Sequence, residues 1–155
     1  MSGPTGGRDA PEDEGVQTGL AIDLPEVHAE VSAAFAVYER ALVGNDVATL
    51  DALFLPSART IRYGIGENLY GIEAIRAFRR ARPTRGLERA LARTVITTYG
   101  RDFATAMTEF VRPAWGDPPT RIGRQSQTWC RFALPGHGGW RVVAAHVSEI
   151  DFPAA

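Results

Sequence analysis

Residues 87–112, LERALARTVITTYGRDFATAMTEFVR, decide the fold that the sequence predicts. Two runs within it, 87–99 and 102–112, are rich in Thr, Val, Phe and Tyr, and the turn signal YGRD separates them. Two more runs of this kind, 120–133 and 140–150, follow after turns rich in Gly and Pro. The sequence therefore predicts four long antiparallel strands joined as a meander.

Helical signals precede these strands. Asp23 is the expected N-cap of a first helix, whose apolar residues recur at three- and four-residue spacing. Gly44–Asn45 supplies a left-handed stop for this helix. A second helix is expected over residues 46–53, and a third over residues 71–82, where Pro83 ends it.

Between the second and third helices, residues 59–65 favour a strand, and Glu67 and Asn68 fall in the turn after it. Helices followed by a long meander indicate an α+β fold. A sheet of this length that is covered by helices on one face only must curl around them. We therefore expect a cone, in which three N-terminal helices pack on a curved, mostly antiparallel sheet and a ligand pocket lies at the open end.

Length and composition predict one globular domain. The chain has 155 residues, 45% of them hydrophobic, and its formal net charge of −1 gives no basic footprint for nucleic acid or membrane partners. Residues 1–19 contain little that is apolar, so we expect a disordered tail there and a single domain over residues 20–152. No apolar run approaches the ~18 residues of a membrane span, and no signal pattern begins the chain, so a cytoplasmic protein is expected.

Several kinds of chemistry are excluded by what the sequence lacks. Cys130 is the only cysteine, so no internal disulfide and no paired-cysteine site can form. All seventeen basic residues are arginine, which excludes Schiff-base chemistry and a Walker-type phosphate loop. The three histidines lack metal-ligand spacing, so we expect neither a metal nor another cofactor. The chemistry that the sequence still allows is acid–base catalysis and electrostatic stabilisation by Arg, Tyr, His, Asp and Glu.

Two residues are the strongest candidates for such work. Tyr38 lies on the apolar stripe of the first helix, so its hydroxyl enters the interior and needs a partner there. Arg62 alternates within its strand together with Thr60 and Gly64, and it points either to solvent or into the interior. In the interior it needs a carboxylate, which either Glu67 or a bound ligand supplies.

Further polar residues accumulate where a central strand should be apolar. Residues 124–129, RQSQTW, occupy the middle of the third long strand, and His146 interrupts the apolar run of the fourth. One arginine of the third helix, Arg79, is expected at the rim of the pocket. The candidate substrate-binding residues are Glu67, Asn68, Arg79, Arg124, Gln125, Trp129 and His146.

The order of these elements resembles the nuclear transport factor 2-like (SnoaL-like, cystatin-like) superfamily. Three segments resemble its AtzH-like family, which includes oxalurate-catabolism proteins of the HpxZ type. They are Tyr38–Glu39, residues 62–82 (RYGIGENLYGIEAIRAFRRAR) and residues 123–129 (GRQSQTW). The resemblance spans roughly residues 22–151, which is nearly the whole expected domain.

This resemblance implies a small metal-free decarboxylating amidohydrolase of ureide metabolism, acting on a carboxylated urea such as dicarboxyurea or on oxalurate. Tyr38 and Arg62 correspond to the catalytic tyrosine and arginine of the family. In this interpretation Arg62 anchors the anion and polarises its carbonyl, and Tyr38 donates a proton to the leaving nitrogen. The resemblance also implies a homodimer and a functional partner amidase.

Two other functions remain open. The protein is alternatively a non-catalytic dimer that binds small carboxylates or assists an amidase, because fold does not fix function. An isomerase of the ketosteroid type is disfavoured, since it needs a carboxylate base where the first strand carries Arg62.

Overall fold

Six strands form one sheet in the computed structural model of the protein, which describes residues 19–152. The strands lie in the order β2-β1-β6-β5-β4-β3, and all neighbours are antiparallel except β1 and β6, which are parallel. The tail predicted over residues 1–19 lies outside the described residues except for Gly19. The strands are β1 (Ile61–Tyr63), β2 (Asn68–Tyr70), β3 (Ala90–Tyr99), β4 (Phe103–Val111), β5 (Arg121–Arg131) and β6 (Trp140–Asp151).

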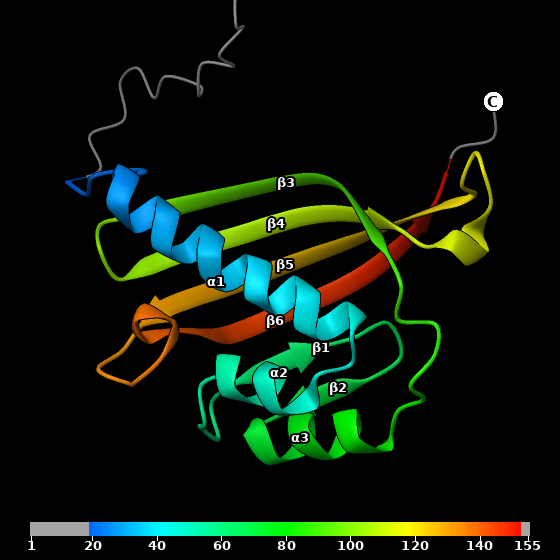
Figure 1. Ribbon diagram of the computed structural model, residues 1–155, viewed down its shortest axis with the longest axis horizontal. Coiled ribbons are helices and arrows are strands. Elements are labelled where there is room, and N and C mark those ends of the chain that lie inside the picture. Colours follow the sequence, from blue (N-terminus) through cyan, green and yellow to red (C-terminus); the bar gives the residue numbers. More distant parts are fainter. Residues whose placement is uncertain (1–18, 153–155) are drawn as a thin grey trace, which may run out of the picture.

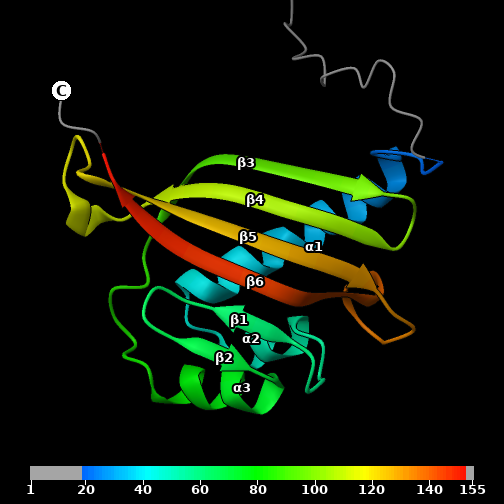
Figure 2. The ribbon, with the colours of Figure 1, turned by 180° about the vertical axis from the view of Figure 1, so that it is seen from behind.

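Helices cover one face of this sheet. Helix α1 (Pro25–Val43) crosses the long strands, while α2 (Val47–Leu53) and α3 (Ile72–Ala81) lie beside β1 and β2 (Figure 1). The opposite face, turned toward the reader in Figure 2, carries no helix among the described residues. The predicted α+β architecture is therefore confirmed. None of the helices within residues 19–152 is long and apolar enough to cross a membrane.

The core lies between α1 and the covered face of the sheet, which we call the inner face. The predicted apolar stripe of α1 is buried, and it meets aromatic side chains of the long strands. Burial of this stripe supplies most of the free energy that holds α1 on the sheet. The core residues include Val31, Phe35, Tyr38, Leu42, Leu50, Leu53, Phe54, Ile75, Trp129, Trp140 and Val142.

The four long strands agree with the prediction, and alternation along them fixes what each face carries. On β5, residues Gly123, Gln125, Gln127 and Trp129 are buried on the inner face. The residues between them, such as Arg124 and Ser126, belong to the helix-free face, which we call the outer face. A single strand thus presents amides to the core and charged groups to the opposite side.

The start of the first helix differs from the prediction. Leu24, rather than Asp23, precedes α1, and no side chain caps it. Asp23 has a φ of 55° and pairs instead with β3, where its carboxylate accepts from the Thr98 amide at 2.8 Å. At the C-terminal end of α1, Asn45 adopts the left-handed conformation and Gly44 does not. The prediction of Asp23 as N-cap was wrong because the sheet offers its carboxylate a better donor.

The hairpin after α2 is also more regular than predicted. Strand β1 spans only Ile61–Tyr63 of the expected 59–65, and Asn68 begins β2 instead of lying in a turn. The Gly64 amide donates to the Glu67 carbonyl at 2.9 Å and closes the hairpin. A strand of three residues is too short to show a period in the sequence, so β2 was not predicted.

A buried ion pair connects α1 to the segment before β3. Arg89, whose side chain is 1% exposed, donates from Nε to Glu39 Oε1 at 2.8 Å and from Nη2 to Oε2 at 2.7 Å. Arg89 Nη2 also donates to Gln125 Oε1 at 3.1 Å, and the guanidinium lies 4.5 Å from the Phe110 ring centroid. This arginine therefore links a helix, a loop and a central strand.

We expect Glu39→Ala to lower the free energy of unfolding by about 3–5 kcal/mol, because it leaves Arg89 buried without its counter-charge. Urea denaturation measures this loss. The matched control is Glu26→Ala, which removes the exposed pair Arg101–Glu26 (3.3 Å) and should change stability by less than about 1 kcal/mol. Similar losses of stability in Glu39→Ala and Glu26→Ala would contradict the conclusion that Arg89 and Glu39 form a buried ion pair.

Candidate functional site

One cross-strand row on the inner face contains the first polar residues of the candidate site. Arg62 on β1 lies opposite Ala145 on β6, which lies opposite Gln127 on β5 and then Ala106 on β4. Strands are about 4.8 Å apart, so the Cα atoms of Arg62 and Gln127 are about 10 Å from each other. The two alanines are small and leave room for the long polar side chains beside them.

Arg62 points inward and is paired with Glu67, which resolves the orientation that the sequence left open. Its Nη1 donates to Glu67 Oε1 at 2.8 Å, and the Arg62 side chain is 12% exposed. The Glu67 carboxylate lies where a Cβ on residue 64 would stand, so only glycine at that position permits this pair. Glu67 Oε2 also accepts from the Gly66 amide at 3.2 Å. The hairpin β1–β2 thus orients Arg62.

Tyr38 reaches the same interior from α1. The residue is 3% exposed, and its ring packs near Phe35 and Phe54, with centroid separations of 6.5 and 6.2 Å. Within residues 19–152 its hydroxyl makes no hydrogen bond. A buried phenol without a partner is a donor available to a ligand.

Arg79 is more deeply placed than predicted. It was expected at a pocket rim, but it is 3% exposed, and its Nη1 donates to Asp51 Oδ1 at 2.9 Å. Its guanidinium also lies 4.2 Å from the Phe54 ring centroid. Burial lowers the pKa of Arg79, and the positive charge of Arg62 also lowers it. Tyr38 and Asp51 act in the opposite direction and raise the pKa of Arg79. Arg79 therefore lies within electrostatic range of both sequence-predicted catalytic residues.

Arg82, just after α3, belongs to this cluster and was not predicted as a site residue. Burial lowers its pKa, repulsion from Arg62 and Arg79 lowers it further, and Tyr38 and Glu67 raise it. Its Nε and Nη2 atoms are buried and have no hydrogen-bond partner among the described residues. In the sequence, Arg82 is one of several arginines near the end of a helix, and their spacing does not separate it from its exposed neighbours.

The two glutamines of β5 add unpaired amide donors. Gln127, which is 2% exposed, accepts at Oε1 from Trp129 Nε1 at 3.1 Å, so the indole positions this amide. Gln125 accepts at Oε1 from Arg89. In both glutamines Nε2 is buried and has no partner within the described residues. Of the predicted residues in this stretch, Gln125 and Trp129 thus face the inner side.

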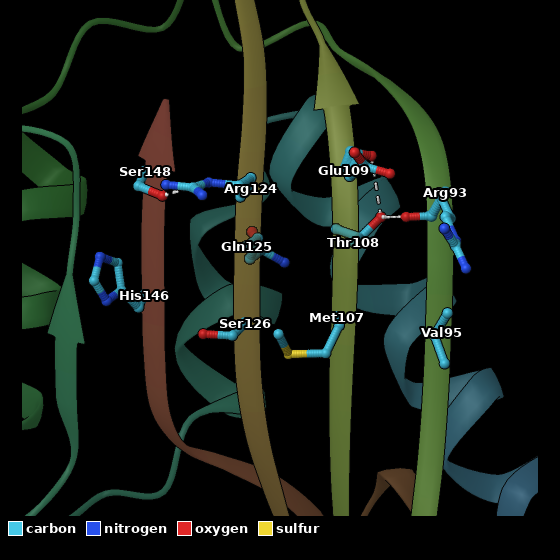
Figure 3. Close-up of a pocket in the computed structure, with 10 residues that line it drawn as sticks. All are labelled: Arg93, Val95, Met107, Thr108, Glu109, Arg124, Gln125, Ser126, His146 and Ser148. Carbon is cyan, nitrogen blue, oxygen red and sulfur yellow. Dashed lines mark hydrogen bonds between the residues drawn. The ribbon is translucent and has the colours of Figure 1, made fainter. Parts of the chain in front are cut away.

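Three other predicted residues do not join Tyr38 and Arg62. Arg124 and His146 line a hollow of about 520 Å³ on the outer face, where Arg124 Nε donates to Ser148 Oγ at 3.2 Å (Figure 3). Asn68 is exposed and lies opposite Tyr63 in the hairpin. Each of them differs by one position in the strand alternation from a residue that faces inward. The structure therefore separates them from the inner cluster by the thickness of the sheet.

We call Tyr38, Arg62, Glu67, Asp51, Arg79, Arg82 and Gln127 the inner polar cluster. Arg62 and Arg79 each have a carboxylate partner, whereas Arg82 has none among the described residues. The cluster therefore carries one positive charge in excess, and its unpaired polar atoms are donors. Such an arrangement suits an anion with several acceptor oxygens.

The fold is that of the nuclear transport factor 2-like, cystatin-like class of α+β proteins. The chain belongs to the AtzH-like family, whose model matches residues 20–152.

Solved structures agree with this assignment. A protein of unknown function from Pectobacterium atrosepticum is 58% identical, with a TM-score of 0.76 over 83% of this chain and 94% of that one. A cystatin-like fold protein from Burkholderia xenovorans is 48% identical, with a TM-score of 0.77 over 87% and 100%. A nuclear transport factor 2-like superfamily protein from Salmonella enterica is 25% identical, with a TM-score of 0.60 over 79% and 90%. None of the proteins with curated descriptions matches the chain.

We expect Gly64→Ala to displace the Glu67 carboxylate and leave Arg62 without its partner. The carboxylate swings away, so the backbone stays in place and the loss is that of a charged hydrogen bond, about 1.5–3 kcal/mol in urea denaturation. The matched control is Gly66→Ala, where an added Cβ meets no atom within 4 Å.

The Glu67→Gln variant tests the same contact independently. Because Gly64→Ala acts through Glu67, the double variant should be hardly less stable than Glu67→Gln alone. Additive losses would show that the alanine disturbs something other than this pair.

Proposed function

We propose that the protein is a decarboxylating amidohydrolase that acts, without a metal, on a small carboxylated urea or ureide anion in nitrogen catabolism. Membership of the AtzH-like family supports this proposal. The observation that carries it is the Tyr38 hydroxyl, which has no hydrogen bond within residues 19–152 and lies in electrostatic range of Arg79 and Arg82. A hydroxyl donor and an excess of positive charge are therefore combined in one cluster.

For a dicarboxyurea dianion, the reaction takes up one proton and yields allophanate and carbon dioxide. The bond between a carboxylate carbon and its urea nitrogen breaks, and the electron pair stays on nitrogen and is delocalised to the urea carbonyl oxygen. Arg62 stabilises the charge on that oxygen. Tyr38 protonates the nitrogen and recovers its proton from solvent. Carbamate-type carboxylates leave readily, so one general acid and one fixed cation suffice for this step.

The pairing of Arg62 suits it to this role. Glu67 holds the guanidinium by one Nη1 contact, and no further hydrogen bond of Arg62 is present among the described residues. Its remaining N–H groups are thus available to an oxyanion without movement of the side chain.

The same geometry disfavours the isomerase. That reaction needs a carboxylate free to accept a proton, and the two carboxylates of the inner polar cluster, Glu67 and Asp51, each pair with an arginine. The non-catalytic carboxylate binder remains the second candidate, because the excess positive charge serves binding as well as turnover.

We expect Tyr38→Phe and Arg62→Ala to lower kcat at least about 10²-fold on dicarboxyurea, because each removes a group that acts in the transition state. Release of carbon dioxide and appearance of the product amide measure turnover by the purified protein. Tyr70→Phe is the matched control, since this tyrosine is 61% exposed and, within residues 19–152, its hydroxyl bonds to that of Tyr63 alone.

Absence of turnover by the wild-type protein, together with thermal stabilisation by oxalurate, would instead support the binder. Turnover that appears only after addition of an amidase would identify an accessory partner.

We also propose a homodimer formed through the outer face. Val95 and Met107 are 47% and 52% exposed there, side by side with charged residues of both signs (Figure 3). A long sheet face without helices and with exposed apolar side chains is typical of a contact surface.

Met107→Asp should therefore convert a dimer to a monomer in light scattering, whereas a wild-type monomer would contradict the proposal.

A further inference from the structure

Arg89 and Arg82 both have a buried Nε–Nη2 donor edge, and among the described residues Arg89 uses it whereas Arg82 does not. Arg89 holds Glu39 through Nε and Nη2, with contacts of 2.8 and 2.7 Å to the two carboxylate oxygens. On Arg82 the same two atoms are buried and lack any partner within residues 19–152. Nε and Nη2 point from one edge of the planar guanidinium, which is the edge that binds a carboxylate with two parallel hydrogen bonds.

An unused edge of this kind is costly to bury. A buried donor without an acceptor loses about 1–3 kcal/mol relative to a donor in water, and Arg82 has two of them. Repulsion from Arg62 and Arg79 adds to this cost. A purely structural side chain would turn its end to solvent, as arginines at helix ends commonly do. The position of Arg82 is therefore one that a bound anion would stabilise.

We propose that Arg82 binds a carboxylate group of the ligand through its Nε and Nη2 atoms, and that this is the carboxylate that the reaction leaves in place. The second part rests on the proposed function. An ion pair stabilises a carboxylate in the ground state, so a carboxylate held by Arg82 would lose carbon dioxide more slowly. The departing group must lie elsewhere, beside Tyr38, while Arg82 holds the opposite end of the molecule.

The proposal defines a substrate class. The ligand carries one carboxylate for Arg82 and, some atoms away, a carbonyl oxygen for Arg62. Gln127, in the same cross-strand row as Arg62, offers its unpaired Nε2 to a further acceptor. Small ureido acids that bear a terminal carboxylate satisfy these conditions, and neutral ureas do not.

The test compares oxalurate with its neutral amide, oxaluramide, by isothermal titration calorimetry. Arg82→Gln should weaken binding of oxalurate by about 10- to 100-fold, the equivalent of a charged hydrogen bond, and change binding of oxaluramide less than about twofold. Arg82→Lys keeps the charge without the two-point edge, so its affinity for oxalurate should be intermediate. Arg80→Gln is the matched control, because Arg80 lies two residues earlier, on α3, and is exposed.

Folding does not confound this test. Because the edge is unpaired in the free protein, Arg82→Gln should melt at the same temperature as the wild type or higher. With dicarboxyurea as substrate, Arg82→Gln should raise KM about 10-fold or more and change kcat only a few-fold. Tyr38→Phe, in contrast, should mainly lower kcat.

The two proposals fail separately. The role of Arg82 would be overturned if Arg82→Gln bound oxalurate as tightly as the wild type does. It would also be overturned if the wild type bound oxalurate and oxaluramide equally. The proposed reaction would then still be tested by the Tyr38 and Arg62 variants. Binding that depends on Arg82 without any turnover would overturn the amidohydrolase and leave Arg82 as the carboxylate-binding residue.

Discussion

The contact between Arg62 and Glu67 is the constraint on which the inner polar cluster depends. A guanidinium in the interior needs a nearby carboxylate, and this one comes from the same hairpin, five residues along the chain. This pair in turn requires a residue without a side chain at position 64. A local element of a few residues thus fixes an arginine on the inner face, and the long strands only have to supply small neighbours for it.

Most of the architecture could be predicted because its signals are long. Alternation over about ten residues identifies each of the four main strands, and three- and four-residue spacing identifies α1. Short elements gave no such signal, which is why β2 was missed and Asn68 was assigned to a turn. Asp23 shows a second limit of prediction from sequence. Its carboxylate can accept a hydrogen bond either from the start of its own helix or from a distant strand, and here the donor is the Thr98 amide on β3.

The candidate site was harder to predict than the fold, because the sequence does not show which face of a strand or helix each polar residue occupies. Tyr38 stands out in the sequence because it lies on an apolar stripe, and Arg62 because it is a charged residue inside a predicted strand. Arg124 and Gln125 are adjacent, and the sequence does not show which of them the sheet turns inward. Arg79 and Arg82 share a helix end with exposed arginines, and only the tertiary packing reveals that both approach the interior. The outer-face positions of Arg124, His146 and Asn68 follow from the same ambiguity.

The parallel junction between β1 and β6 has a mechanical consequence. Arg62 pairs in register with Ala145, and the next residue of β6, His146, already belongs to the outer face. The sheet is one backbone thick at this point, so a single peptide unit of β6 separates the side that carries Arg62 from the outer face. A displacement of β6 at the outer face would therefore also move Ala145, the inner-face neighbour of Arg62.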